Sequence, residues 1–113
     1  MKLREIVTKL NLSVRTGEDF LDVDVKRGYA SDLMSDVIAN TRENDLWITL
    51  QGHVNTIAIA AMKDLAGLVL INSRQPEAET AAKAEKEHIP ILISDLPAFE
   101  LIGKLYALGI TGI

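Results

Sequence analysis

Three short, almost wholly apolar runs that alternate with helical patterns constrain the fold of this chain more than any other feature. The runs comprise residues 46–50, 67–71 and 90–94. Helical spacing follows each of them, over residues 56–63, over residues 77–88, and in a last helix opened by Asp95 and Pro97 and closed by Gly109. Strands that are apolar on both faces are typical of a parallel sheet covered on both sides. The sequence therefore predicts an α/β three-layer sandwich with a mainly parallel sheet, helices on both faces and right-handed crossovers.

The N-terminal part of the chain adds shorter elements. An apolar stripe at helical spacing predicts a helix over residues 2–10, and a short strand is expected over residues 12–15. Residues 20–25 alternate between apolar and acidic side chains, which predicts a half-buried strand. Gly28 then indicates a turn or a close approach of two backbones.

Capping residues and apolar faces place the helices more closely. Ser31 or Asp32 is expected to cap a helix that ends near residues 40–44, and Asn55 to cap the next one. Pro76 suits the start of the third helix, because the first turn does not need its missing amide. The last helix is expected to turn four large side chains inward, namely Phe99, Ile102, Leu105 and Tyr106.

Size and composition describe one soluble domain spanning residues 1–113. The chain has no cysteine, which excludes disulfides and thiolate metal sites. Its net charge of −4 argues against nucleic-acid binding, which needs a basic face. No apolar run approaches the ~20 residues of a membrane span, and the N-terminus does not look like a signal peptide. We expect a cytoplasmic protein that binds neither nucleic acid nor membrane.

Polar side chains follow the apolar runs at the place where a parallel sheet would gather them. Ligands of such sheets bind outside the carboxyl ends of the strands. Helix N-termini beside that edge have free amides that favour anions, and an arginine adds a planar cation. We therefore expect a nucleotide or small anion to bind there, through Thr49, Gln51, His53, Asn55 and Arg74.

The same side chains also have structural explanations, which stay open at this stage. Polar residues at the ends of elements commonly cap helices or satisfy nearby backbone groups, as Thr49, Gln51, His53, Asn55 and Asp95 could do here. Ser31 and Asp32 could contact a ligand or a partner protein instead of capping a helix. Arg74 could pair with Glu77 or Glu79 on the surface.

Motifs of known catalysts are missing from the chain. It contains no Gly-x-x-x-x-Gly-Lys phosphate loop, no Gly-x-Gly-x-x-Gly fingerprint and no Gly-x-Ser-x-Gly elbow. The two histidines, His53 and His88, are far apart in sequence and form no recognisable metal set. We expect no catalysis, no metal and no cofactor. The competing enzyme hypothesis would use His53 as a general base with Asp32 or Asp95 nearby.

Several segments together resemble the DRTGG domain family, over roughly residues 1–110. These segments are residues 28–37, Leu46-Trp47-Ile48-Thr49, Gln51-Gly52-His53-Val54-Asn55 and Ile89-Pro90-Ile91-Leu92. The namesake pentapeptide is poorly kept, since Asp24-Val25-Lys26-Arg27-Gly28 retains only its first Asp and last Gly. The resemblance implies a standalone α/β domain, with Ser31, Asp32, Thr49, Gln51, His53 and Asn55 as candidate ligand positions.

The resemblance also implies a regulatory role. DRTGG domains occur alone or joined to phosphotransacetylase-like enzymes and to pyrophosphatases with CBS domains, where they are associated with adenine-nucleotide sensing or subunit contact. Their fold is similar to the N-terminal domain of HPr kinase/phosphorylase, but without a phosphate loop no kinase activity is expected here. We predict a regulatory or ligand-sensing domain that forms a homodimer or contacts an enzyme. The alternative is a protein-interaction or dimerisation subunit that docks on an enzyme through exposed apolar residues of its last helix, around Leu101, Leu108 and Ile110.

Overall fold

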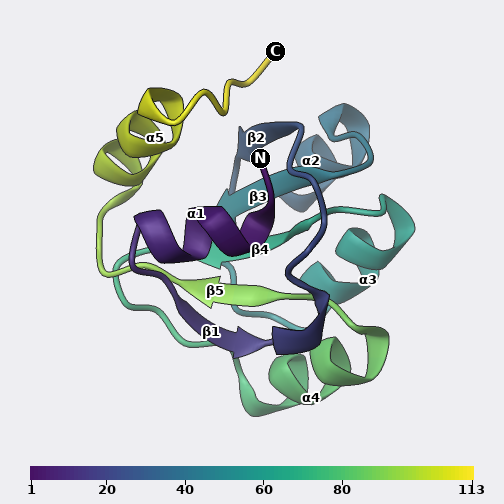
Figure 1. The fold of residues 1–113 in the computed structure, drawn as a ribbon. Coiled ribbons are helices and arrows are strands. Elements are labelled where there is room, and N and C mark those ends of the chain that lie inside the picture. Colours follow the sequence, from purple (N-terminus) through teal and green to yellow (C-terminus); the bar gives the residue numbers. More distant parts are fainter.

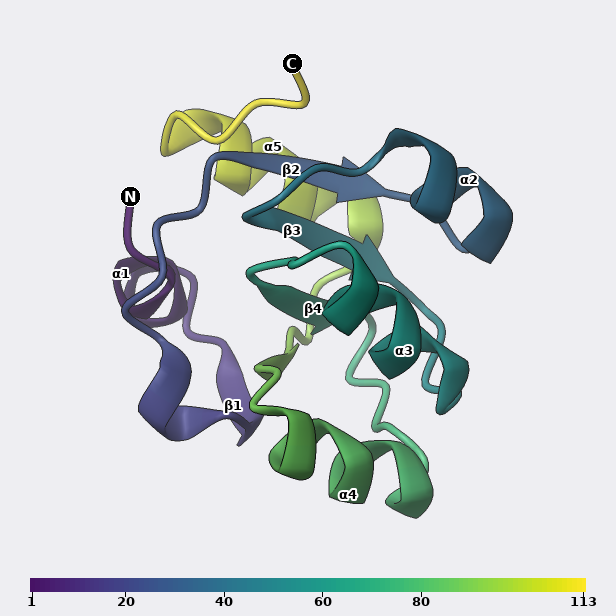
Figure 2. The ribbon, with the colours of Figure 1, turned by 90° about the vertical axis from the view of Figure 1, so that its right-hand side faces the viewer.

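Five strands form one sheet in the order β1-β5-β4-β3-β2, with helices on both of its faces (Figures 1 and 2). The computed structural model describes residues 1–113. Its elements in chain order are α1 (Leu3–Lys9), β1 (Ser13–Thr16), the 3₁₀-helix η1 (Glu18–Phe20), β2 (Arg27–Ala30), α2 (Met34–Asn40), β3 (Asp45–Thr49), α3 (Asn55–Met62), β4 (Gly67–Leu70), α4 (Ala78–Glu87), β5 (Ile91–Ile93) and α5 (Ala98–Ala107). Strands β2 to β5 run parallel, and β1 pairs antiparallel with β5. The predicted α/β sandwich with a mainly parallel sheet is confirmed.

Two apolar cores lie on opposite faces of the sheet, because side chains alternate along each strand. Leu46 and Ile48 of β3 belong to the core that α1 and α5 cover. Trp47, which stands between them, belongs to the core under α2, α3 and α4. Figure 2 views the molecule from the side of these three helices, with α5 behind the sheet. The apolar runs are thus buried on both faces, as their composition predicts.

The segment over residues 20–25 is not a strand, and that prediction is wrong. Its carbonyl groups accept hydrogen bonds from the first turn of α1 instead, with Leu3 N–H bonded to Val23 O at 2.9 Å and Arg4 N–H to Leu21 O at 2.8 Å. The first amides of a helix have no partner within it, so the segment satisfies them. The alternation of apolar and acidic residues therefore reflects packing against a helix end.

Gly28 lies inside strand β2, so the expected turn is wrong, although a close backbone approach is found. The Gly28 amide donates to Thr111 O at 2.9 Å, which places the C-terminal tail against the outer edge of the sheet. Ser31 and Asp32 do not cap α2, whose N-cap is Leu33. Asn55 does not cap α3 either, because it is the first residue of that helix.

Helix α5 turns only part of the expected face inward. Leu105 is buried as predicted, and Leu101 is buried beside it, whereas Phe99 is 87% and Tyr106 55% exposed. The sequence of α5 has two apolar stripes at helical spacing, and the sheet packs against the stripe that contains Leu101. The prediction for Phe99 and Tyr106 is therefore wrong. The docking hypothesis is also wrong to place Leu101 and Ile110 on the surface, since both are buried.

Candidate functional site

The carboxyl ends of β2 to β5 lie next to one another along one edge of the sheet. The parallel register pairs Ala30 with Ile48 and Thr49 with Leu70, so each strand ends near the end of its neighbour. The loops that leave this edge lead into α2, α3, α4 and α5. The shared edge on which the predicted site depends is therefore present.

Asp32 is the polar centre of this edge. Its Oδ1 accepts hydrogen bonds from the Thr49 hydroxyl at 2.7 Å and from the Leu50 amide at 2.8 Å. Gln51 donates from Nε2 to the Asp32 carbonyl at 3.2 Å and from its backbone amide to Thr49 Oγ1 at 3.1 Å. These bonds fix the end of β2 to the end of β3. They leave the second carboxylate oxygen, Oδ2, without a partner in the chain.

Ser31 is held at the same place by backbone and side-chain bonds. Its amide donates to Ile48 O at 3.2 Å, and its carbonyl accepts from Trp47 Nε1 at 2.8 Å. Its hydroxyl oxygen accepts the Leu33 amide at 3.1 Å. Trp47 is fully buried, so this bond satisfies the only donor of its side chain. These bonds hold Ser31 and Asp32 in place at the end of β2.

His53 and Asn55 form a local turn in the loop before α3. His53 Nδ1 accepts the Asn55 amide at 3.1 Å, and the His53 carbonyl accepts the Thr56 hydroxyl at 2.7 Å. His53 makes no hydrogen bond or ion pair with Asp32 or Asp95, so the pairing on which the enzyme hypothesis depends does not form. The structural explanation is therefore correct for His53, whose ring nitrogen accepts a backbone amide, whereas the cap predicted at Asn55 is not formed.

Arg74 lies on the loop after β4. The neighbouring Ser73 donates its hydroxyl to Asp95 Oδ1 at 2.7 Å, which joins the ends of β4 and β5. Arg74 is exposed and forms no ion pair, so its alternative pairing with Glu77 or Glu79 does not occur. Its guanidinium is free to meet a ligand at the rim.

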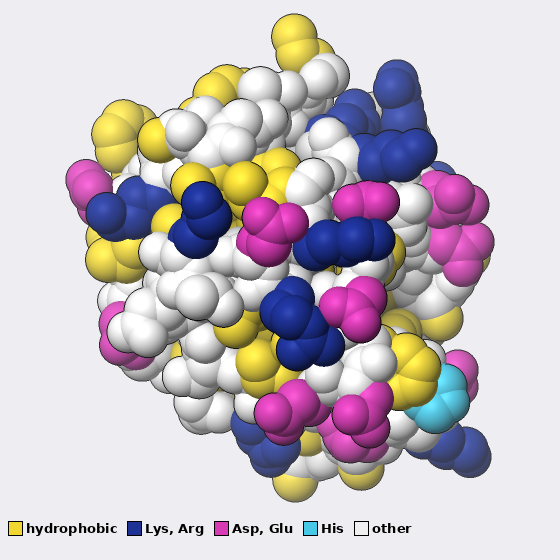
Figure 3. Space-filling view, in the orientation of Figure 1, with side chains coloured by type: hydrophobic (Ala, Val, Ile, Leu, Met, Phe, Trp, Pro, Cys, Tyr) yellow, Lys and Arg dark blue, Asp and Glu magenta, His cyan; other side chains and the backbone are white.

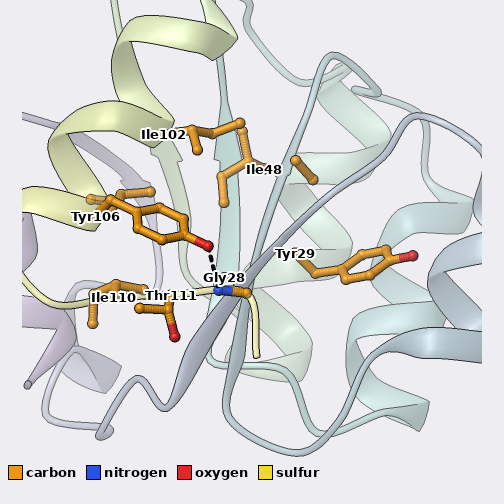
Figure 4. Close-up of a pocket in the computed structure, with 10 residues that line it drawn as sticks. Gly28, Tyr29, Ile48, Ile102, Tyr106, Ile110 and Thr111 are labelled. Atoms are coloured by element: carbon orange, nitrogen blue, oxygen red, sulfur yellow. Dashed lines mark hydrogen bonds between the residues drawn. The ribbon is translucent and has the colours of Figure 1, made fainter.

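Two adjoining cavities lie between the sheet edge and α5. The smaller, of about 190 Å³, is lined by Ala30, Ser31, Asp32, Ile48, Thr49, Ile71 and Ala98. The larger, of about 250 Å³, extends along β2 and is mostly apolar (Figure 4). Its walls include Gly28, Ile102, Tyr106 and Ile110, and Ala30 and Ile48 line both cavities. Three predicted residues, Ser31, Asp32 and Thr49, thus share a cavity, whereas Gln51, His53, Asn55 and Arg74 lie outside both.

The sequence did not indicate that α5 lines these two cavities. Ala98, Ile102 and Tyr106 follow one another at intervals of four residues and line the two cavities. The second apolar stripe of α5 was the available signal, because a helix needs only one stripe to cover a sheet.

An ion pair between Arg27 and the buried Asp45 lies at the other end of β2. Arg27 Nε and Nη2 bind the Asp45 carboxylate at 2.9 Å, and Arg27 Nη2 also donates to Asn40 O at 2.8 Å. Asp45 is completely buried, and the Arg42 amide donates to its Oδ2 at 2.8 Å. The hydrogen bond to Asp45 raises the pKa of Arg27, although burial opposes this shift. The pair fixes Arg27 beside the tail, where its Nη1 lies 3.5 Å from Gly112 O.

Tyr29 is in β2 but its ring turns away from the larger cavity (Figure 4). Its hydroxyl donates to Asp36 Oδ2 of α2 at 2.8 Å. This bond raises the pKa of Tyr29 and lowers the pKa of Asp36. Tyr106, on the opposite side, is therefore the aromatic ring that borders the cavity.

The structure has no group of three or more His, Cys, Asp or Glu side chains arranged to hold a metal ion. None of its helices combines the length and the apolar character that crossing a bilayer requires.

Comparisons with known proteins place the fold. No family model matches the chain, and no curated protein matches it. Among solved structures, the chain is similar to the crystal structure of the CBS and DRTGG domains of the regulatory region of Clostridium perfringens pyrophosphatase, complexed with the activator diadenosine tetraphosphate. The TM-score is 0.71 at 14% sequence identity, over 98% of this chain and 48% of that one, so the chain spans about half of this neighbour. The likeness supports the DRTGG-like fold that the sequence indicates.

Proposed function

We propose that this domain is a regulatory, ligand-sensing module without catalysis of its own, which binds a nucleotide or another small ligand at the carboxyl edge of its sheet. The observation that carries the proposal is the state of Asp32. Asp32 is an exposed residue that lines the smaller cavity; its Oδ1 accepts from Thr49 and Leu50, and its Oδ2 has no partner in the chain. A rigidly held acceptor of this kind is ready to bind a ligand at little cost in ordering.

The charge of Asp32 determines which part of a ligand can lie next to it. A carboxylate repels phosphate and accepts hydrogen bonds from hydroxyl or amino groups. A nucleotide would therefore place its hydroxyl groups at Asp32. Its phosphates would lie along the rim toward Arg74, which has no ion pair and stands two strands farther along the sheet.

The structural neighbour adds support of a general kind. That structure is of the CBS and DRTGG domains of a regulatory region in complex with a nucleotide activator. A regulatory role with nucleotide sensing is thus consistent with the fold, because the similar domain belongs to a regulatory region that binds a nucleotide activator. The ligand proposed for the present chain rests on the chemistry of Asp32 and Arg74.

A thermal-shift screen with nucleotides, nucleosides and inorganic phosphate tests the proposal. A ligand at 100 times its dissociation constant should stabilise the domain by about 2.7 kcal/mol. The variant D32N keeps an Oδ1 that accepts from Thr49 and Leu50, but it replaces the free oxygen by a donor. We expect D32N to melt close to the wild type and to bind the ligand at least about tenfold more weakly, because a hydrogen bond to a charged group is lost. Equal binding by D32N, or no shift with any compound, would contradict the proposal.

A second candidate function, contact with another subunit, is favoured by the exposed face of α5. Phe99 is 87% exposed, Tyr106 is 55% exposed, and Ile102 lies between them on the helix. Hydrophobic side chains are visible at the upper left of Figure 3, where α5 lies in Figure 1. A homodimer or a complex with an enzyme could bury them. Light scattering of the wild type and of F99K would test self-association, and a wild type that stays monomeric would exclude the homodimer.

A further inference from the structure

The larger cavity lies next to the polar site. Both cavities border Ala30 and Ile48, so they are neighbours along β2, and we call them together the cleft, of which each is one end. Their volumes of about 250 and 190 Å³ are each small for a ligand site. Together they fall in the range of roughly 300–1,000 Å³ that is usual for small-molecule pockets.

The two ends of this cleft differ in chemistry. Ser31, Asp32 and Thr49 stand at one end. The other end is built mainly from Gly28, Ile102 and Tyr106. Asp32 is the only charged residue in the walls of either cavity, and no lysine or arginine lines them. An anionic group inside the cleft would have no cation to meet and one carboxylate to avoid.

The apolar end is bordered by strand β2 and by the ring of Tyr106. Gly28 has no side chain, and a Cβ at this position would lie 3.6 Å from Ile48 Cδ1 and 3.8 Å from Ile110 Cγ2, at ordinary contact distance. The ring of Tyr106 lies opposite, and its hydroxyl accepts the Gly112 amide at 3.3 Å (Figure 4). That bond fixes the ring against the tail. A planar ligand between β2 and Tyr106 would gain aromatic contact on one face and aliphatic contact on the other.

We propose that this cleft, between α5 and strands β2 and β3, binds the uncharged nucleoside part of the ligand. The base lies at the apolar end beside Tyr106, and the ribose hydroxyls donate to Asp32. A nucleoside suits both ends at once, because it joins a flat ring to a pair of hydroxyl donors. The inference rests on the proposed function and specifies its ligand class.

Calorimetry with adenosine, 2′,3′-dideoxyadenosine, AMP and ATP tests the inference. Adenosine should bind without any phosphate, because the contacts proposed for its base and ribose lie inside the cleft, whereas Arg74 lies outside it and would add to the affinity of AMP and ATP alone. Removal of both ribose hydroxyls should weaken binding about tenfold or more, since Asp32 then loses its donors. If ATP binds and adenosine does not, the inference is overturned and the proposed function is kept. If none of the four compounds binds, the inference is overturned, and the proposed function is overturned as well if no compound of the thermal-shift screen stabilises the domain.

Two variants locate the binding in the cleft. A30I adds a β-branched side chain at the junction of the cavities, on an exposed strand position that tolerates it. It should keep its melting temperature and lose adenosine binding by tenfold or more. Y106L provides a second variant that removes the ring with little loss of burial, and it should weaken binding severalfold. K86A, at an exposed position of α4 on the other face of the sheet, is the matched control and should bind adenosine as the wild type does. Full binding by A30I, or loss of binding only in K86A, would overturn the inference.

Discussion

The Arg27–Asp45 pair should contribute more to stability than any other charged contact of this domain, and D45N tests this. Asp45 has no exposed surface, and its carboxylate accepts from two guanidinium nitrogens and the Arg42 amide. Removing one partner of such a pair typically costs about 3–5 kcal/mol, because the other charge stays buried. The entropy of unfolding for a chain of this size is about 0.24 kcal/mol/K, so the melting temperature should fall by about 12–20 °C.

Differential scanning calorimetry and urea unfolding would measure the effect. The surface pair of Arg4 with Asp22 gives a matched control, because its Nε–Oδ1 distance is 3.0 Å but the Asp22 side chain is 76% exposed. D22N should cost less than about 1 kcal/mol. The double variant R27M/D45N should lose less stability than the sum of the single losses, since the two residues are in contact. If D45N melts within about 3 °C of the wild type, the pair is not desolvated as its burial indicates.

Two further predictions concern backbone space and pH. G17A should be destabilised, because Gly17 has φ +74° and a Cβ there would lie 2.7 Å from the Pro90 backbone. G103A should instead raise the free energy of unfolding by about 0.5–1 kcal/mol, because Gly103 lies within α5 and a Cβ there would meet no other atom. Urea midpoints compare the two, and equal midpoints would contradict the steric argument. The Tyr29 hydroxyl lowers the pKa of Asp36, so the stability that this bond supplies is complete above pH ~4 and is lost as the pH falls through the lower, folded-state pKa. Y29F should therefore show a smaller loss of stability than the wild type between pH 4 and 2 in urea titrations, and identical slopes would count against the assignment.

The sheet could be predicted from the sequence because its strands must be apolar on both faces. Residues 46–50, 67–71 and 90–94 satisfy this condition, and the observed strands lie within one residue of each. Residues 20–25 follow an equally regular alternation but bind the amides of α1. Alternation reports which side chains are buried, and it does not report which backbone groups pair with the segment. A partner at the helix end could not be inferred without the tertiary structure.

The candidate site illustrates the same limit through contacts between distant residues. The sequence placed polar residues at the ends of the strands, and Ser31, Asp32 and Thr49 do meet there. It could not indicate that Asp32 bonds to Thr49 in preference to capping α2, because both arrangements satisfy a carboxylate. The choice depends on the parallel pairing of β2 with β3, which brings the two residues together.

Helix α5 links the two candidate functions physically. Its side chains Ala98, Ile102 and Tyr106 line the cleft, while Phe99 stands in solvent on the same helix. A ligand in the cleft would contact Tyr106, whose hydroxyl also holds the C-terminal tail at Gly112. Occupation of the cleft and the surface offered to a partner therefore depend on the same element. If both candidate functions hold, a ligand in the cleft and a partner on the exposed face of α5 would contact the same helix, while the Asp32 and Asp45 contacts hold the two ends of β2 and β3 together.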